Sequence, residues 1–278
     1  MMSRILLLGG EGFVGRNISE TLSARFDCSS VGIASSVFPR KDSFLSTDPY
    51  RETVSGEYDV VIHLIDHQIE STLFERGEEM LMRNIKWATS KHLIVFSSAV
   101  LYANPSSPYG KRKMMLEDFY EKYCRDYDIH LTVVRLFNTY GKFQFPYRQG
   151  SLVANLLFNY FRGVPSEIID MNAMRDFMYA GDIGVFIQRI IEERVYETID
   201  LATENMITIG ELIEMIRETL HLSNMDIHCK NISENISCPA GKNILLDKTR
   251  LTPIEEGIKK TFSFYQANRG KMEVLLGT

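Results

Sequence analysis

Short runs of hydrophobic residues alternate with longer segments of mixed polarity through the first half of the chain. The runs are continuously apolar and rich in leucine and β-branched residues, as expected for strands buried on both faces. Gly, Asp or Ser residues bound the runs, and the segments between them are long enough for helices. The predicted strands are residues 4–8, 30–34, 60–64, 93–97 and 131–136. This alternation predicts an α/β fold with a doubly wound parallel sheet.

The second half of the chain has a different pattern. Residues 151–161 predict an apolar helix, and residues 211–220 predict an amphipathic helix with Thr208 as its candidate N-cap. Residues 196–202 between them predict a late strand. We therefore expect a small C-terminal lobe that is interleaved with the sheet domain. The expected division is residues 1–141 plus 175–207 for the sheet domain and residues 142–174 plus 208–278 for the lobe.

Composition and charge exclude several classes of protein. With 45% hydrophobic and 24% charged residues among 278, the chain has the composition of a soluble globular protein. No apolar run approaches the ~20 residues that a membrane span requires, and the first residues lack the features of a signal peptide. A net charge of −5 argues against a nucleic-acid partner. The four scattered cysteines form no metal-binding spacing, so we expect reduced thiols, no metal and a cytoplasmic location.

A glycine-rich segment directly follows the first predicted strand. Residues 9–15 read GGEGFVG, which contains both a G-x-G-x-x-G and a G-x-x-G-x-x-G spacing. Glycines allow a tight turn and close approach of a pyrophosphate, and the helix that follows supplies free N–H groups. We interpret the segment as a dinucleotide site, the alternative being a glycine turn without a ligand. The residues expected to bind the cofactor are Gly9, Gly12, Phe13, Val14 and Gly15.

The end of the second predicted strand bears on which dinucleotide binds. A strand that selects NAD usually ends on Asp or Glu, which binds the 2′-hydroxyl of the adenosine ribose. Here the strand ends on Ala34, Ser35 and Ser36, which leave room for a 2′-phosphate. Arg40 or Arg16 can meet that phosphate with a charge-assisted hydrogen bond. We expect Ser35 and Arg40 to bind NADP in preference to NAD, although Arg40 can also be a solvated loop charge.

A tyrosine and a lysine stand four residues apart after the fourth predicted strand. On a helix Tyr109 and Lys113 share a face, where the ammonium can lower the pKa of the phenol and prepare it for proton transfer. Ser98 closes the preceding strand and can hydrogen-bond a substrate carbonyl or hydroxyl. Such a pair also occurs by chance on helix surfaces. His63, inside an apolar strand end, is interpreted as a packed or backbone-bonded histidine rather than a base.

Six short segments are specific when they are taken together in this order. They are GGEGFVG at 9–15, DVVIHL at 59–64, FSSAVLY at 96–102, PYGKRKMMLE at 108–117, RLFNTYG at 135–141 and MRDFMYAGDI at 174–183. Together they resemble the extended short-chain dehydrogenase/reductases of the NAD(P)-dependent epimerase/dehydratase type. The resemblance implies a Rossmann fold and an enzyme that modifies nucleotide-linked sugars.

The resemblance also implies roles for individual residues. It implies that Ser98, Tyr109 and Lys113 are the catalytic triad. It also implies that Tyr109 and Lys113 contact the cofactor, where Lys113 binds the nicotinamide ribose. It places Leu64 at the cofactor. The residues implied to hold the diphosphate of a nucleotide sugar are Asn138 and Arg175. For these two the alternatives are a turn residue and a surface ion pair with Asp176.

Departures from the family pattern narrow the implied reaction. Ala99 and Val100 stand where the 4,6-dehydratases carry an acidic pair, and no Cys lies near Ser98 as in the epimerising GDP-sugar reductases. We therefore expect NADPH-dependent reduction of a keto group on a nucleotide-linked 4-keto-6-deoxy sugar, with the proton from Tyr109. The alternatives are an NAD-dependent nucleotide-sugar 4-epimerase and a non-catalytic dinucleotide-binding regulatory protein. The resemblance implies a homodimer, although the apolar residues of 113–126 can instead pack on their own sheet.

Overall fold

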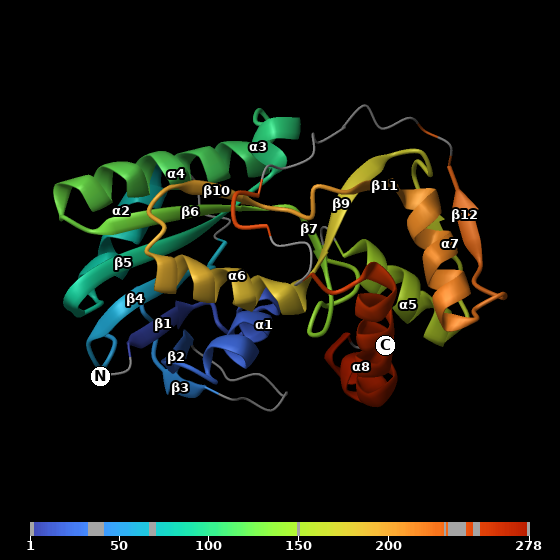
Figure 1. The fold of residues 1–278 in the computed structure, drawn as a ribbon, viewed down its shortest axis with the longest axis horizontal. Helices are drawn as coiled ribbons and strands as arrows, with labels where there is room; N and C mark the ends of the chain where they lie inside the picture. Colours follow the sequence, from blue (N-terminus) through green and yellow to red (C-terminus); the bar gives the residue numbers. More distant parts are fainter. Residues whose placement is uncertain are drawn as a thin grey trace. The chain divides into compact units, whose positions relative to one another are not determined.

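The computed structural model describes residues 3–32, 42–66, 71–148, 151–230, 232, 243–246 and 251–276 (Figure 1). The chain forms two compact units, one of residues 1–136 and 183–200 and the other of residues 137–182 and 201–278. The sequence predicts boundaries after residues 141, 174 and 207, whereas the structure has them after residues 136, 182 and 200. The boundaries differ because β7 (Asn138–Tyr140) pairs with β9 (Met174–Tyr179), which keeps both strands in the second unit.

A seven-stranded sheet forms the centre of the first unit, in the order β10-β6-β5-β4-β1-β2-β3. Its strands are β1 (Arg4–Leu8), β2 (Asp27–Gly32), β3 (Ser43–Ser46), β4 (Tyr58–His63), β5 (Trp87–Ser98), β6 (His130–Leu136) and β10 (Thr198–Leu201). All pairings from β3 through β6 are parallel. The strand order reverses between β1 and β4, and ligands of such sheets bind in the crevice outside the carboxyl ends at this point.

The predicted fold class, a doubly wound parallel α/β sheet, is confirmed. The sequence analysis missed β3, a four-residue strand of sequence SFLS at the edge of the sheet. The strand that ends at Ser98 is therefore the fifth of the chain rather than the fourth. The predicted second strand starts and ends later than β2, and its last two residues lie outside the described residues.

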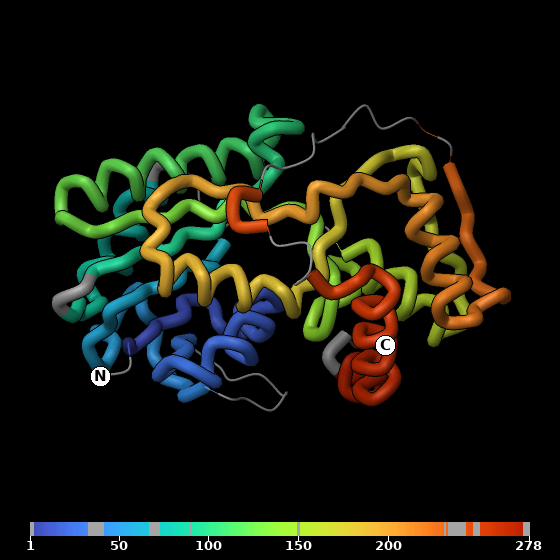
Figure 2. The backbone as a smooth tube through the Cα atoms, in the orientation of Figure 1, coloured from blue at the N-terminus to red at the C-terminus, as the bar shows by residue number. Residues whose placement is uncertain are grey.

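Helices cover both faces of this sheet (Figure 1). One face carries α1 (Phe13–Leu22) and α6 (Ala180–Glu193), which approach closely where Gly184 lies against Thr21. The other face carries α2 (Ser71–Arg83) and α4 (Pro108–Asp126), and the short α3 (Val100–Ala103) precedes α4. Apolar residues of α2 and α4 pack with those of β1, β4 and β5 in one buried core. Figure 2 shows how the segment of α6 and β10 returns to the first 136 residues.

The second unit contains two small sheets and three helices among its described residues. One sheet has the order β11-β9-β7, in which β7 and β9 are parallel and β11 (Met206–Thr208) is antiparallel to β9. In the other, β8 (Ser166–Ile168) pairs with β12 (Ile227–Cys229). The helices are α5 (Leu152–Arg162), α7 (Ile209–Leu220) and α8 (Ile254–Leu276). Thr208 caps α7 as predicted and forms a capping box with Glu211.

A buried carboxylate joins three elements of the first unit and the turn that contains Tyr50. Glu78 of α2 is 1% exposed, and one of its oxygens lies 2.8 Å from Nε2 of His63 at the end of β4. The hydroxyl of Tyr120 on α4 donates to the same oxygen, and Tyr50 also hydrogen-bonds this carboxylate. His63 is therefore packed, as predicted, but its partner is a side-chain carboxylate. A buried polar network of this kind is stable only when its members keep their hydrogen-bond partners.

We predict that Glu78→Ala lowers the free energy of unfolding by about 3–5 kcal/mol. The substitution leaves His63, Tyr50 and Tyr120 in a dry interior without their shared acceptor. Urea denaturation followed by circular dichroism measures the change. The matched control is Glu79→Ala on the same helix, which removes only a half-exposed ion pair with Arg83 and is expected to cost about 0.5 kcal/mol or less. Equal losses in the two variants would contradict the role given to Glu78.

Candidate active site

The glycine loop after β1 is tight enough that glycine is required at two of its positions. Gly9 has a φ of +82°, and its carbonyl accepts a hydrogen bond of 3.0 Å from the N–H of Gly12. A Cβ on Gly15 would lie 2.6 Å from the Cα of Gly10. Any larger residue at position 15 would therefore push α1 away from the loop. The sequence motif thus forms a turn that holds the start of α1 directly against the end of β1.

The N-terminus of α1 is open to an anion. Gly12 is the N-cap, no side chain caps the helix, and no acidic residue lies in its first turn. Phe13 and Val14 begin the helix, so their N–H groups have no partner within it. The N–H of Leu64 donates to the carbonyl of Leu8, which sets the backbone after β4 against Gly9. These residues form a cradle that fits the pyrophosphate of a dinucleotide at the switch point of the sheet.

The adenosine end of the cradle is described only in part. Ser35 and Arg40, the residues expected to select NADP, lie outside the described residues. The side chain of Glu11, by contrast, extends from the loop toward Gly32 at the end of β2, where its Cγ lies 3.9 Å from the position of a Cβ on Gly32. A carboxylate thus lies near the end of the strand that lacks the usual acid.

The candidate catalytic residues converge at the carboxyl end of β5. Ser98 is the last residue of β5, and its Oγ accepts a hydrogen bond from the N–H of Val100. Tyr109 lies in the first turn of α4, which Ser107 caps by accepting from the N–H of Gly110. The hydroxyl of Ser98 acts on the phenol of Tyr109 as a hydrogen-bonding neighbour and lowers its pKa. The structure therefore brings these two groups within reach of one substrate oxygen.

Lys113 lies one turn further along α4 and is almost completely buried. It is 6% exposed, and its Nζ donates a hydrogen bond of 3.1 Å to the carbonyl of Phe96. The Nζ also lies 3.7 Å from Oδ1 of Asp66 and 5.6 Å from the centroid of the Tyr109 ring. The ammonium is thus fixed beneath Tyr109 by the backbone of β5 and by a carboxylate after β4.

The electrostatics of Tyr109 differ from the sequence expectation. Burial raises the pKa of its phenol, and this effect outweighs the hydrogen bond from Ser98, which lowers the pKa. The negative charge of Asp66 raises the pKa further, and the positive charge of Arg112 lowers it. Burial lowers the pKa of Lys113, while Asp66 raises it. The net effect in the structure raises the pKa of the phenol, whereas the sequence predicts that the lysine lowers it.

Asp66 was missed by the sequence analysis. It lies three residues beyond the end of β4, in the segment that leaves the sheet next to the glycine loop. A signal for it was present, because polar residues that follow parallel strands lie in the crevice where ligands bind. The segment DVVIHL that resembles the family ends at residue 64, two residues before Asp66.

Asn138 and Arg175 lie in the second unit, on the small sheet. Asn138 begins β7 and pairs in register with Phe177 of β9, so it is a strand residue rather than a turn residue. Arg175 lies two residues before Phe177 and therefore on the same face of β9. Its neighbour Asp176 lies on the opposite face, 2% exposed, and accepts hydrogen bonds from the N–H and hydroxyl of Thr203.

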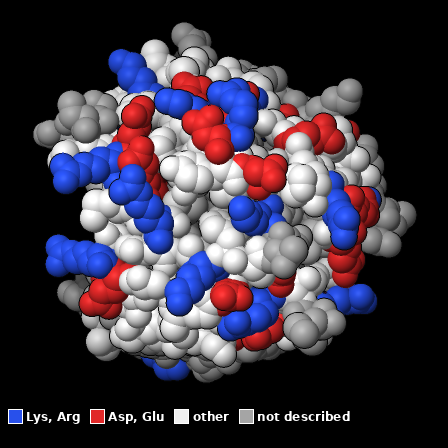
Figure 3. All heavy atoms as spheres, turned by 90° about the vertical axis from the view of Figure 1, so that its left-hand side faces the viewer, with Lys and Arg blue, Asp and Glu red and all other residues white. Residues whose placement is uncertain are grey.

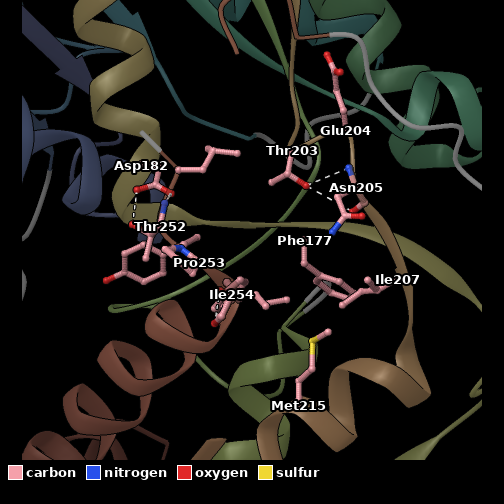
Figure 4. A pocket seen from close by; sticks show the side chains of 13 residues that line it. Phe177, Asp182, Thr203, Glu204, Asn205, Ile207, Met215, Thr252, Pro253 and Ile254 are labelled. Carbon is pink, nitrogen blue, oxygen red and sulfur yellow. Dashed lines mark hydrogen bonds between the residues drawn. The ribbon is translucent and has the colours of Figure 1, made fainter. Parts of the chain in front are cut away.

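A cavity of about 450 Å³ borders that same face within the second unit. Figure 4 shows its lining, with Asp182 and Thr252 hydrogen-bonded on one side and Thr203 and Asn205 on another. Its lining residues are Tyr140, Phe177, Tyr179, Asp182, Thr203, Glu204, Asn205, Ile207, Met215, Leu251, Thr252, Pro253 and Ile254. Ile207 pairs with Arg175 across the sheet, which gives the cavity and the arginine a common face.

Two surface properties bear on partners. Figure 3 shows Lys and Arg interspersed with Asp and Glu over the face that it displays, which offers no continuous basic stripe there. Among the described residues, no helix combines the length and apolar character that a membrane-spanning helix requires. In the same part of the chain, no group of three or more His, Cys, Asp or Glu residues has the arrangement of a metal site.

Comparison with known proteins agrees with this arrangement. A Methanocaldococcus jannaschii protein whose name marks it as a candidate UDP-glucose 4-epimerase is 22% identical over 81% of this chain and 85% of its own. The UDP-N-acetylglucosamine 4-epimerase of Methanobrevibacter ruminantium, solved with UDP-N-acetylmuramic acid, superposes with a TM-score of 0.77 at 19% identity, covering 96% of this chain and 99% of its own. The Thermus thermophilus UDP-glucose 4-epimerase, solved with NAD, gives 0.74 at 18% identity over 95% and 99%.

These solved structures share the fold of this chain. The model of the NAD dependent epimerase/dehydratase family matches residues 5–202, which include the glycine loop, Ser98, Tyr109 and Lys113. This match covers more than half of the 278 residues. The chain therefore belongs to the NAD dependent epimerase/dehydratase family.

Proposed function

We propose that the protein is an NAD-dependent nucleotide-sugar 4-epimerase. The observation that carries this proposal is the convergence of Ser98, Tyr109 and Lys113 at the carboxyl edge of the sheet that also carries the glycine cradle. Hydride and proton transfer must occur at one substrate carbon and its oxygen, so the cofactor and the phenol must share one edge of the sheet.

Tyr109 is the proton carrier of the reaction. Its phenolate accepts the proton of the sugar hydroxyl as the carbon is oxidised, and the phenol returns that proton when the keto sugar is reduced. NAD held in the glycine cradle of residues 9–15 would supply reversible hydride transfer at the sugar carbon. Ser98 hydrogen-bonds the reacting oxygen, and the Lys113 ammonium stabilises the phenolate through its charge.

Epimerisation is better supported than the ketoreduction that the sequence analysis favours. Two structural neighbours are named as 4-epimerases, one of them solved with NAD, and the family is described by its NAD dependence. NAD is therefore the cofactor that we propose, and NADP preference has no support from these relatives. Ala99 and Val100 carry no group that exchanges protons, which argues against a dehydratase.

Glu11 supports the choice of NAD. Its carboxylate lies near Gly32, at the end of the strand whose usual acid is missing. A carboxylate there can accept from the 2′-hydroxyl of the adenosine ribose and repels a 2′-phosphate. We propose that the glycine loop, rather than β2, supplies the acid that selects NAD.

The second unit is proposed to hold the nucleotide half of the substrate. Arg175 and Asn138 lie on the face of the small sheet that borders the cavity, and a guanidinium there suits a diphosphate. The aromatic rings of Tyr140, Phe177 and Tyr179 line the same cavity and offer apolar faces for a base or a sugar.

A cytoplasmic homodimer through α2 and α4 remains a proposal. Leu73 and Met80 of α2 and Met114 of α4 are more than 40% exposed, as is Tyr127 at the end of α4. Leu116, by contrast, is buried in the core of its own unit. The exposed apolar residues of the two helices provide a surface on which a second copy can pack.

We predict that Tyr109→Phe lowers the rate of C4 epimerisation about 10²-fold or more, because no other group at this position can carry the proton. Binding of NAD is expected to be unchanged, since the ring is retained. Chromatography of UDP-glucose and UDP-N-acetylglucosamine after incubation with protein and NAD measures the epimers. The control is Tyr127→Phe, at the exposed end of α4, which should keep full activity. Equal activity in Tyr109→Phe and the parent protein would refute the proposed site.

We predict that Glu11→Gln weakens NAD binding by about tenfold and strengthens NADP binding, because the charge that accepts from the ribose and repels the phosphate is lost. Calorimetric titration with both dinucleotides measures the two dissociation constants. Glu52→Gln, a change at an exposed residue outside the glycine loop, is the control. A ratio of the two constants that stays the same in Glu11→Gln would show that the acid lies elsewhere.

A further inference from the structure

Asp66 lies at the edge of the reaction centre, between solvent and the buried lysine. Its side chain is 45% exposed, whereas that of Lys113 is 8% exposed. The carboxylate follows β4, and the lysine comes from α4, so the two are brought together only by the fold. Their separation of 3.7 Å makes Asp66 the nearest carboxylate to Lys113 among the described ion pairs.

The Lys113 ammonium has lost most of its hydration and needs protein partners. It has three N–H donors, of which one is used by the carbonyl of Phe96. An isolated buried cation is costly unless an anion offsets its charge. Asp66 provides that anion while leaving part of the ammonium directed toward Tyr109, whose ring centroid lies 5.6 Å away.

The charges around Tyr109 come from three elements. From α4, Arg112 and Lys113 each lie 5.6 Å from the ring centroid. Ser98 of β5 lowers the pKa of the phenol through hydrogen bonding, and the charge of Asp66, in the segment after β4, raises that pKa. The negative charge of the buried Glu78 on α2 raises the pKa of Lys113. Without Asp66, the two cations would act on the phenol without the carboxylate that offsets their charge.

That imbalance matters for a reaction that uses both forms of Tyr109. Two cations alone stabilise the phenolate, which eases the return of the proton to the keto sugar but makes the phenolate a weaker base for taking up the proton of the sugar hydroxyl. An anion beside them restores the affinity of the phenol for its proton. The balance is needed only if Tyr109 transfers protons in both directions, so this inference rests on the proposed function.

We propose that Asp66 is a positioning residue of the reaction centre, which holds the Lys113 ammonium in place and keeps the proton that Tyr109 has taken from the sugar hydroxyl on the phenol until the keto sugar takes it back. Asp66 acts through these two residues and need not touch the substrate. It differs from a structural residue in that its charge, and not only its shape, sets the protonation of Tyr109.

The test is Asp66→Asn, which keeps the size of the side chain and removes its charge. Because Asp66 raises the pKa of Tyr109, the pKa must fall in the variant. The rising limb of kcat/KM for epimerisation against pH, which reports the phenolate, should shift to lower pH. Asp59→Asn, at the opposite end of β4, is the matched control and should leave the profile in place.

A second measurement does not depend on activity. In protein labelled with ¹³C at Cζ of tyrosine, the Tyr109 resonance is identified by its loss in Tyr109→Phe and is titrated by NMR. A lower midpoint in Asp66→Asn than in the parent protein supports the proposal, even if no epimerase activity is found and the proposed function fails. An unmoved midpoint overturns the proposal, as does a pH profile that loses height at every pH without shifting.

Discussion

The order of the parallel strands is the constraint on which the candidate site depends. Because the order reverses between β1 and β4, the chain leaves the sheet in opposite directions there and opens a crevice at the carboxyl edge. The glycine loop follows β1, Asp66 follows β4 and Ser98 ends β5. Three neighbouring strands therefore place the glycine cradle, a carboxylate and a hydroxyl at the same edge of the sheet. Helix α4 then needs only to cross this edge to add Tyr109 and Lys113.

Helix α4 carries the proposed catalytic residues and a buried structural tyrosine on one face. Tyr109, Lys113 and Tyr120 all point toward the sheet, and each meets a polar group that the interior must satisfy. The carbonyl of Phe96 and Asp66 serve the lysine, whereas Glu78 serves Tyr120. A buried charged group seldom makes a fold more stable than well-packed apolar residues of the same size would. The retention of such groups beside Tyr109 is consistent with a role in fixing its protonation.

The sequence predicts features that depend on local chemistry and misses those that depend on long-range pairing. The glycine loop, the helix that carries Tyr109 and the Thr208 cap follow from short motifs, and the structure contains them. Strand β3 was missed because its four residues carry little apolar signal. Asp66 and Glu78 acquire their partners from α4, more than 40 residues away in the chain. The expectation of NADP depends on Ser35 and Arg40, which lie outside the described residues, and the relatives give it no support.

The central claim is that a sugar carbon is oxidised and reduced again within one site on this sheet. The most direct test uses UDP-glucose or UDP-N-acetylglucosamine with deuterium at C4, incubated with protein and NAD in ordinary water. The account predicts a C4 epimer that retains the deuterium, because the hydride leaves and returns without exchange with solvent. An epimer that has lost its deuterium to water, or a reduced or dehydrated sugar in its place, would contradict it.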